Sequence, residues 1–366
     1  MSELAFEMWT QWSSTQGTLP MTHLTQGFEP PKLPVTLLSR RHAISGAAAL
    51  SFAAALPGMC LGAGWRPEKA IRIVVPVAPG GSVDLMARLL ASHLQTVWGQ
   101  STWVENRSGG AGTIGVAEVV SQAGDGHTIL VSNPGPTAIA YSIFANLPYK
   151  PDQLQPVSNM FRIPNIVSAH PSVGIKSIPE LIGFLRANPN KLNYGSSGIG
   201  TTPHLASAWF LQLTGLKMTH VPFRGAAPAL QAALAGDVQI LFDNLYPSLP
   251  QILDGKLIGL AVTTPERSVL SPNLPTLREI DSKLANFDVS SWCGVFLPKN
   301  APPPVVEAFN QQIKLLLERE DVQKHLVAMG AQPDYGTAQR FGSFLQAENA
   351  KFAAIIKQEN LQMNVN

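Results

Sequence analysis

The chain has 366 residues, of which 45% are hydrophobic and 14% are charged, with a formal net charge of +2. This composition excludes a disordered chain, and the nearly balanced charge argues against a nucleic-acid partner. Two cysteines, Cys60 and Cys293, are too few for a zinc cluster or a disulfide framework, so no metal or other cofactor is expected.

The N-terminal segment carries the features of an export signal. An arginine pair at 40–41 precedes an uncharged run at 43–64 that is rich in Ala, Leu and Gly. A basic segment, an apolar segment and small residues in this order are typical of a cleaved secretory signal peptide. We therefore interpret residues 35–64 as the signal peptide. Residues 1–34 are interpreted either as a non-native extension or as the result of a start site placed too early, with translation beginning near Val35. The mature protein would begin near Trp65 and reach the periplasm by the general secretory or the twin-arginine route.

The mature chain is predicted to begin with a strand, a glycine turn and a helix. Residues 70–77, AIRIVVPV, form a β-branched run that is typical of a parallel strand buried on both faces. The turn and the helix N-terminus could bind an anion, and a tight structural turn explains the same glycines equally well. Asp84 is more readily explained as a cap of the helix amides than as a ligand contact. The candidate contacts here are Pro79, Gly80, Gly81, Ser82 and Asp84.

Two further strands are predicted at 101–107 and 127–133, with a helix between them. The glycines at 110–115 have the G-x-G-x-x-G spacing of a dinucleotide site, but the preceding strand ends in polar residues. No acidic residue lies at the ribose-binding distance, so we reject NAD binding and predict a turn that helps to line a cleft. Ser132 and Asn133 end the third strand, where ligands of α/β sheets bind, and are candidate contacts.

The middle of the chain is bounded by two long extended passages, at 154–171 and 287–298. Between them we predict alternating strands and helices, with Ser177 capping a helix and a proline-rich turn after the strand at 238–244. After the second passage we predict two C-terminal helices, which would return to the first part of the chain. This alternation is typical of an α/β fold.

Two extended passages imply that one α/β domain is inserted into another. We predict a two-lobe architecture, with lobe 1 formed by residues 65–165 and 292–366 and lobe 2 by residues 166–291. When the lobes close on a ligand, the backbone angles of the crossing segments near Asn165 and Trp292 would change and act as a hinge.

The segment NYGSSGIGTTPHL, at 193–205, contains five hydroxyl-bearing residues and three glycines and precedes an apolar helix. It does not contain the G-x-S-x-G spacing of a nucleophile elbow. Hydroxyls and free amides at a helix start bind a carboxylate reversibly, so we predict half of a carboxylate site here. His204 is favoured as a structural hydrogen-bonding residue and kept as a candidate. The candidate contacts are Ser196, Ser197, Gly200, Thr201, Thr202 and His204.

Asp243 and Asn244 end the apolar strand ILFDN in the second half of the chain. This strand end is a usual place for ligands of α/β sheets, so Asp243 is a candidate partner for an amino or hydroxyl group. Capping of a turn is the alternative for the same side chain.

These segments in this order resemble the Bug family, the extracytoplasmic solute receptors of tripartite tricarboxylate transport systems. The resemblance covers nearly all of residues 67–360. The matching stretches are IRIVVPVAPGGSVDLMAR, VENRSGGAGTIG, YGSSGIGTTPHLA, HVPFRGAAPALQAALAGDVQILFDN, GLAVTTPERS and LPTLRE. Ser108 and Gly109 stand where the family commonly has Pro-Gly, which leaves the geometry of that turn open.

The resemblance implies a periplasmic two-lobe binding protein of type II that is not an enzyme. Its ligand would be a small carboxylic acid: a dicarboxylate, a tricarboxylate, an amino acid or an aromatic acid. One carboxylate would be held by the loop at 79–82, partly through ordered waters, and by the Ser/Thr-rich loop at 196–202. We expect a monomer that delivers its ligand to membrane transporter subunits.

Two other functions fit the same sequence features. A sensory protein that presents its ligand-bound form to a signalling receptor would use the same closing cleft. A secreted hydrolase of small esters or amides would use Ser196 or Ser197 together with His204.

Overall fold

The computed structural model describes residues 64–362, and its strands form a mixed sheet in the order β2-β1-β3-β9-β4-β7-β5-β6, with β8 and β10 paired to β4. Apart from Gly64, the predicted signal peptide and the extension before it lie outside the described residues. The strands are β1 (Ile71–Val75), β2 (Thr102–Asn106), β3 (Thr128–Ser132), β4 (Leu154–Ala169), β5 (Asn193–Ser196), β6 (Thr219–Pro222), β7 (Ile240–Asn244), β8 (Ile258–Val262), β9 (Ser290–Pro298) and β10 (Gln332–Pro333).

Helices cover the strands and connect them. They are α3 (Ser82–Trp98), α4 (Thr113–Val120), α5 (Ala140–Ile143), α6 (Ile178–Ala187), α7 (Thr202–Thr214), α8 (Ala226–Ala235), α9 (Leu245–Leu253), α10 (Pro303–Leu317), α11 (Glu320–Ala328) and α12 (Ala338–Gln358).

The predicted strand, turn and helix at the start of the mature chain are confirmed. β1 pairs in parallel with β2 and β3, and Ile71, Ile73 and Val75 are fully buried. α3 begins directly after Gly81 and ends at Gly99, whose left-handed backbone closes the helix. The β-branched run thus forms the inner strand of a parallel group, as its apolar pattern predicts.

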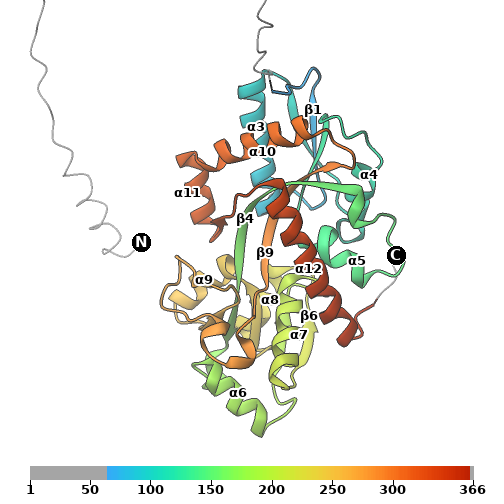
Figure 1. The fold of residues 1–366 in the computed structure, drawn as a ribbon. Coiled ribbons are helices and arrows are strands. Elements are labelled where there is room, and N and C mark those ends of the chain that lie inside the picture. The colour runs from blue at the N-terminus through green and yellow to red at the C-terminus, as the bar shows by residue number, and fades with distance from the viewer. Residues whose placement is uncertain (1–63, 363–366) are drawn as a thin grey trace, which may run out of the picture. The chain divides into compact units, whose positions relative to one another are not determined.

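The two predicted extended passages are β4 and β9, and they lie side by side. They pair antiparallel from Leu154 opposite Pro298 to Pro164 opposite Ser290. From Asn165 onward β4 pairs instead with β7 and β8. In Figure 1, β4 and β9 run between a group that contains β1, α3 and α4 and a group that contains α6, α7, α8 and α9. The predicted α/β architecture of two groups of elements joined by two crossing strands is confirmed. The lobe boundaries given above stay a prediction.

The second group repeats the parallel arrangement of the first. β5 pairs in parallel with both β6 and β7, and α7 and α8 pack against this sheet. The side chain of Ser177 accepts a hydrogen bond from the Glu180 N–H, so its predicted capping of α6 is confirmed.

Two sequence-based expectations are wrong. The proline-rich turn after β7 is the helix α9, which tolerates Pro247 because an N–H in the first helical turn has no intrahelical acceptor. The C-terminal part contains three helices, because α11 and the short strand β10 intervene between α10 and α12. α10 packs on α3, as expected of a return to the first group, whereas α12 contacts both α5 and α7.

Candidate functional site

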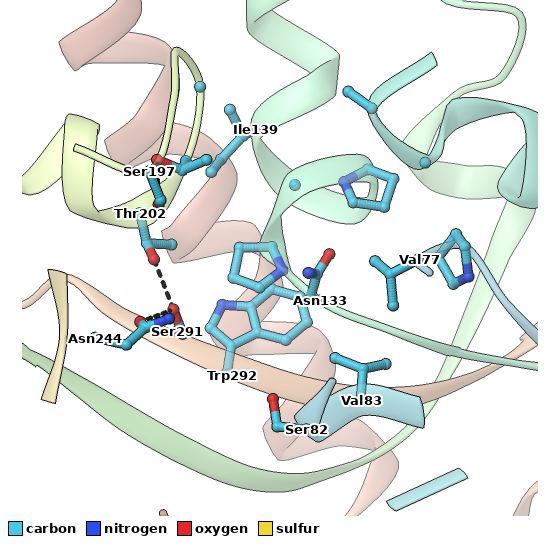
Figure 2. Close-up of a pocket in the computed structure, with 18 of the residues that line it drawn as sticks. Val77, Ser82, Val83, Asn133, Ile139, Ser197, Thr202, Asn244, Ser291 and Trp292 are labelled. Atoms are coloured by element: carbon cyan, nitrogen blue, oxygen red, sulfur yellow. Dashed lines mark hydrogen bonds between the residues drawn. The ribbon is translucent and has the colours of Figure 1, made fainter. Parts of the chain in front are cut away.

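A cavity of about 490 Å³ opens where loops from both groups of elements meet β4 and β9 (Figure 2). The first group supplies the segments at 76–83, 108–112 and 133–139, and the second supplies 197–203 and the end of β7. The glycine-rich turn with the dinucleotide spacing therefore lines a cleft. Seven of the predicted contacts come together here: Ser82, Asn133, Ser197, Gly200, Thr201, Thr202 and Asn244.

Hydroxyl groups in this cavity form two short chains of hydrogen bonds. The Ser197 hydroxyl donates to Thr201 Oγ1 at 3.3 Å, and Thr201 Oγ1 donates to the Gly198 carbonyl at 2.7 Å. Thr202 Oγ1 lies 2.7 Å from Ser291 Oγ, which donates to Asn244 Oδ1 at 2.8 Å. Figure 2 shows this second chain of contacts between the loop before α7 and the strand β9.

Four of the described helices, α3, α4, α7 and α9, begin at this cavity. Ser82, Gly112, Thr201 and Asn244 lie at their first residues or N-caps and line it. None of these four helix starts is capped by a side-chain hydrogen bond from its N-cap residue. The first amides of a helix lack intrahelical acceptors and carry partial positive charge. The cavity therefore collects helix starts whose amides can face a ligand, and no described residue that lines it has an ionisable side chain.

Gly200 shapes the loop that leads into α7. Its φ of +78° is a left-handed conformation that residues with a Cβ rarely adopt. A Cβ added there would also lie 2.9 Å from Ile143 Cδ1. Glycine at this position therefore lets the loop approach the end of α5.

Asp84 lies behind the cavity in a network of its own. It accepts hydrogen bonds from the Gly80 N–H at 2.9 Å, from Arg88 at 3.0 Å and from Asn106 at 2.9 Å. Burial alone would raise the pKa of Asp84, but these hydrogen bonds hold it below its ordinary value. Asp84 thus shapes the loop before α3. The predicted contacts outside the cavity lining are Pro79, Gly80, Gly81, Asp84, Ser132, Ser196, His204 and Asp243.

Ser196 and His204 are buried and form a cluster with His220, which is partly exposed. Ser196 Oγ lies 2.7 Å from His220 Nε2, and His204 Nδ1 accepts a hydrogen bond from the Gly200 N–H at 3.2 Å. The two imidazoles stack with their centroids 4.2 Å apart. Burial lowers the pKa of His204 to about 3 and that of His220 to about 4, so both rings are neutral near pH 7. The hydrolase alternative requires Ser196 or Ser197 to pair with His204, and neither hydroxyl forms a hydrogen bond with that ring here.

Ser132 and Asp243 are both fully buried at the ends of their strands. Asp243 accepts a hydrogen bond from Ser248 at 3.1 Å, and burial raises its pKa to about 7. Ser132 Oγ and Asp243 Oδ1 have no hydrogen-bond partner among the described residues. Their neighbours Asn133 and Asn244 reach the cavity instead, because successive residues of a strand face opposite sides.

The apolar part of the cavity wall was missed by sequence reasoning. It includes Ile139, Phe161, Ile163 and Trp292, and Ser291 adds a hydroxyl next to them. Phe161, Ile163 and Trp292 belong to the long buried strands β4 and β9. Their hydrophobicity is the same whether a side chain faces the core or a cavity, so no signal in the sequence separates the two.

Two groups of α/β elements, joined by paired strands and enclosing a cavity, define a two-lobe solute-binding receptor. The family model described as tripartite tricarboxylate transporter family receptor matches residues 86–361. The chain belongs to this family, and the resemblance to Bug proteins is confirmed. Among residues 64–362, no helix combines the length and apolarity needed to cross a bilayer.

Individual relatives agree with this assignment. Protein BugT of Bordetella pertussis is 31% identical over 299 residues, which are 81% of this chain and 91% of BugT. An R. palustris structure with adipate has 33% identity and a TM-score of 0.69, covering 80% of this chain and 97% of that one. MatC from Rhodopseudomonas palustris, with bound malate, has 29% identity and a TM-score of 0.66, covering 79% and 99%. Family and fold are those of periplasmic solute-binding receptors, so the chain is not an enzyme.

Proposed function

We propose that this receptor is exported to the periplasm and captures a small carboxylate for a tripartite tricarboxylate transport system. The observation that carries the proposal is the convergence of four uncapped helix starts on one cavity that contains six hydroxyl side chains and two amides. Those side chains belong to Ser82, Ser108, Asn133, Ser197, Thr201, Thr202, Asn244 and Ser291. Such a site favours an anion without needing a cation.

The carboxylate would lie between the loop before α3 and the loop before α7. Ser82 on one side would donate to its oxygens. On the other side Ser197, Thr201 and Thr202 would do so after their hydroxyl protons turn away from their present acceptors. The rest of the ligand would contact the apolar wall that includes Trp292. Adipate and malate, the ligands named for two structural relatives, are small carboxylates of a size that this cavity admits.

The first test is a thermal-shift screen of purified protein with malate, adipate, citrate, glutamate and benzoate. A ligand at 100 times its dissociation constant stabilises the folded state by about 2.7 kcal/mol, which a melting curve resolves. At least one carboxylate should raise the melting temperature, and its uncharged amide analogue should not. No shift with any of them, tested to millimolar concentration, would contradict the proposal.

The second test is the double variant Ser197→Ala with Thr201→Val, which nearly preserves side-chain volume and removes two hydroxyls. A hydrogen bond to a charged group contributes about 1.5–3 kcal/mol, so losing one should raise the dissociation constant about tenfold or more. Calorimetry with the carboxylate from the screen measures the change. The matched control is Ser92→Ala with Thr96→Val, the same changes at the same spacing on the exposed face of α3. Equal affinity of both variants would place the carboxylate elsewhere.

A further inference from the structure

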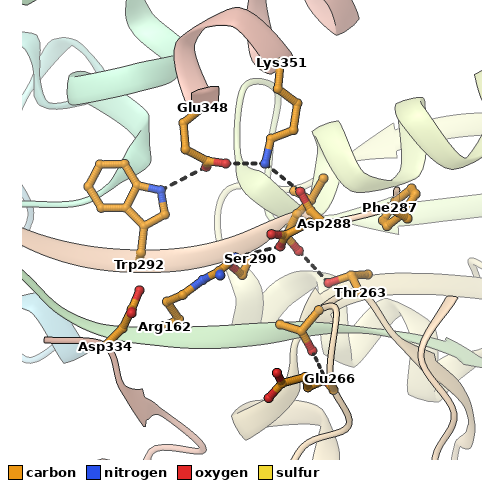
Figure 3. Close-up of polar contacts among 12 residues, drawn as sticks. Arg162, Thr263, Glu266, Phe287, Asp288, Ser290, Trp292, Asp334, Glu348 and Lys351 are labelled. Atoms are coloured by element: carbon orange, nitrogen blue, oxygen red, sulfur yellow. Dashed lines mark hydrogen bonds and ion pairs between the residues drawn. The ribbon is translucent and has the colours of Figure 1, made fainter. Parts of the chain in front are cut away.

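Trp292 has one side in the ligand cavity and the other in the core of the protein. Its ring lines the cavity, and its side chain is almost fully buried. On the far side its indole Nε1–H donates to Glu348 Oε2 of α12 at 3.1 Å (Figure 3). The wall of the cavity is thereby joined to the C-terminal helix by a single directional contact.

The other contacts of the indole leave its orientation less defined. Phe341 and Phe344 of α12 meet the ring edge to face, with centroids 5.9 and 5.8 Å away. Aromatic packing of this kind is favourable over a range of positions, whereas a hydrogen bond weakens steeply when its angle changes. The bond to Glu348 is therefore the contact that fixes how the indole lies against the cavity.

Glu348 is itself held in place by charged groups. Only 3% of it is exposed, and its second carboxylate oxygen, Oε1, pairs with the Lys351 ammonium group. Lys351 also donates to the backbone carbonyl of Asp288 at 2.6 Å, and the Asp288 carboxylate accepts from Arg162 at 2.6 Å. The network in Figure 3 thus connects α12 with the residues before β9 and with β4.

Arg162 completes the network on the neighbouring strand. It is the register partner of Trp292 across β4 and β9, and it also donates to Ser290. Both carboxylate oxygens of Glu348 are occupied, one by the Trp292 indole and the other by Lys351, so the carboxylate has little freedom to move. A buried charge so arranged is well placed to orient a neighbouring donor.

We propose that Glu348 is a positioning residue, which fixes the Trp292 indole in the orientation that forms the apolar wall of the ligand cavity. The proposal rests on the proposed carboxylate-binding function of that cavity. Glu348 does not touch the ligand and acts through Trp292. The affinity for the ligand should therefore depend on a hydrogen bond outside the cavity.

The test compares Glu348→Leu, which removes the acceptor, with Glu348→Gln, whose amide oxygen can still accept from the indole. Binding of whichever of adipate or malate binds tighter is measured by calorimetry. We expect Glu348→Leu to raise the dissociation constant about tenfold and Glu348→Gln to raise it less than about threefold. In a Trp292→Phe background, which has no indole N–H, Glu348→Leu should have no further effect. An equal effect in both backgrounds, or no effect in either, would overturn the proposal.

Lys351→Met is the matched control, because it removes the other partner of Glu348 without touching Trp292. It should lower the melting temperature and raise the dissociation constant less than Glu348→Leu does, because the indole N–H keeps its acceptor. A loss of affinity as large as that of Glu348→Leu would assign the effect to the ion pair and overturn the proposal.

A readout without ligand separates this proposal from the function on which it rests. The indole N–H resonance of Trp292, identified by its absence in Trp292→Phe, should shift in Glu348→Leu and should shift less in Lys351→Met, in which the acceptor remains. If neither adipate nor malate binds, the position of this resonance is the remaining test of the positioning role of Glu348. An unchanged resonance in Glu348→Leu would then overturn the positioning role.

Discussion

A single buried carboxyl group, that of Asp243, should make stability depend on pH. Burial raises its pKa from 3.8 to about 7, so the folded state binds this proton more tightly than the unfolded state. The stabilisation that this raised pKa provides is present in full below about pH 4 and is lost as the pH rises to about 7.

Asp243→Asn should remove that loss. Between pH 4 and pH 8 the wild-type protein should lose about 2–4 kcal/mol of unfolding free energy more than the variant, since one pKa unit corresponds to about 1.4 kcal/mol. Urea unfolding of both proteins at the two pH values measures the difference. If the unfolding free energies of the two proteins change in parallel with pH, burial does not raise the pKa of Asp243.

The stacked pair of His204 and His220 should have the opposite dependence. Their folded pKa values, about 3 and about 4, lie below the ordinary value of 6.5. The stability of the neutral rings is present in full above pH 6.5 and is lost as the pH falls toward 4. Because His204 accepts from the Gly200 N–H, protonation would also disturb the loop that lines the cavity.

His220→Gln should reduce this acid sensitivity. From pH 7.5 to pH 4.5 the wild-type protein should lose about 1–2 kcal/mol more than the variant, a value reduced for the partial exposure of His220. Guanidinium unfolding at the two pH values tests this difference. If the variant loses as much stability as the wild-type protein, the rings do not carry the acid sensitivity.

At the scale of elements, the contact between β9 and α12 depends on a glycine. A Cβ added at Gly294 would enter the ring of Phe341, with Cε1 only 2.8 Å away. Phe341 is buried among Trp292, Phe296 and Phe344, so its ring has little room to move. The close approach of helix and strand beside the cavity therefore requires that β9 carry no side chain there.

Gly294→Ala should destabilise the protein by about 1–3 kcal/mol, the usual cost of overpacking a core. Adding Phe341→Leu should recover part of this loss, because the smaller side chain admits the methyl group. Gly183→Ala in α6 is the matched control: nothing lies within 4 Å of its added Cβ, and it should stabilise by up to about 1 kcal/mol. If the double variant loses as much unfolding free energy as the two single variants together, the added methyl group does not clash with the ring of Phe341.

The elements that the sequence predicted best are those with one unambiguous local signal. β1 and β7 are short apolar runs next to glycine or polar residues, and the N-cap Ser177 marks the start of α6. α9 was missed because Pro247 and Pro250 indicate a break, although tertiary packing of Leu245 and Ser248 holds the helix. Local propensity is a weak guide where packing decides.

The polar half of the site was predictable and the apolar half was not. Ser197, Thr201 and Thr202 stand out because hydroxyls gather between glycines before a helix. Trp292 and Phe161 lie in strands that are buried along almost their whole length. Which of their side chains face a cavity depends on the register between β4 and β9, and only the folded structure supplies that register.

For the whole molecule, the central question is how the two groups of elements respond to a ligand. β4 pairs with β9 as far as Pro164 and with β7 and β8 from Asn165 onward, so the change of partners falls between two neighbouring residues. Trp292 lies nearby on β9, opposite Arg162. These positions agree with the crossing segments at which we predict the hinge.

Closure follows if a ligand binds both walls of the cavity more tightly when they are close together. One wall carries Ser82 and the other carries Thr202, and a ligand can shift the protein only by its differential affinity for the closed form. α12 contacts both α5 and α7, so part of its packing must adjust when the groups move.

We therefore expect a smaller radius of gyration with saturating carboxylate than without it, measured by small-angle X-ray scattering on the same sample. Hinge closure in two-lobe proteins displaces segments by more than about 2 Å, enough to change the scattering curve. The Ser197→Ala with Thr201→Val variant should need more ligand for the same change, while Ser92→Ala with Thr96→Val should respond like the wild-type protein. An identical radius with and without ligand, at a concentration where calorimetry shows full binding, would mean that the cavity binds its ligand without closing.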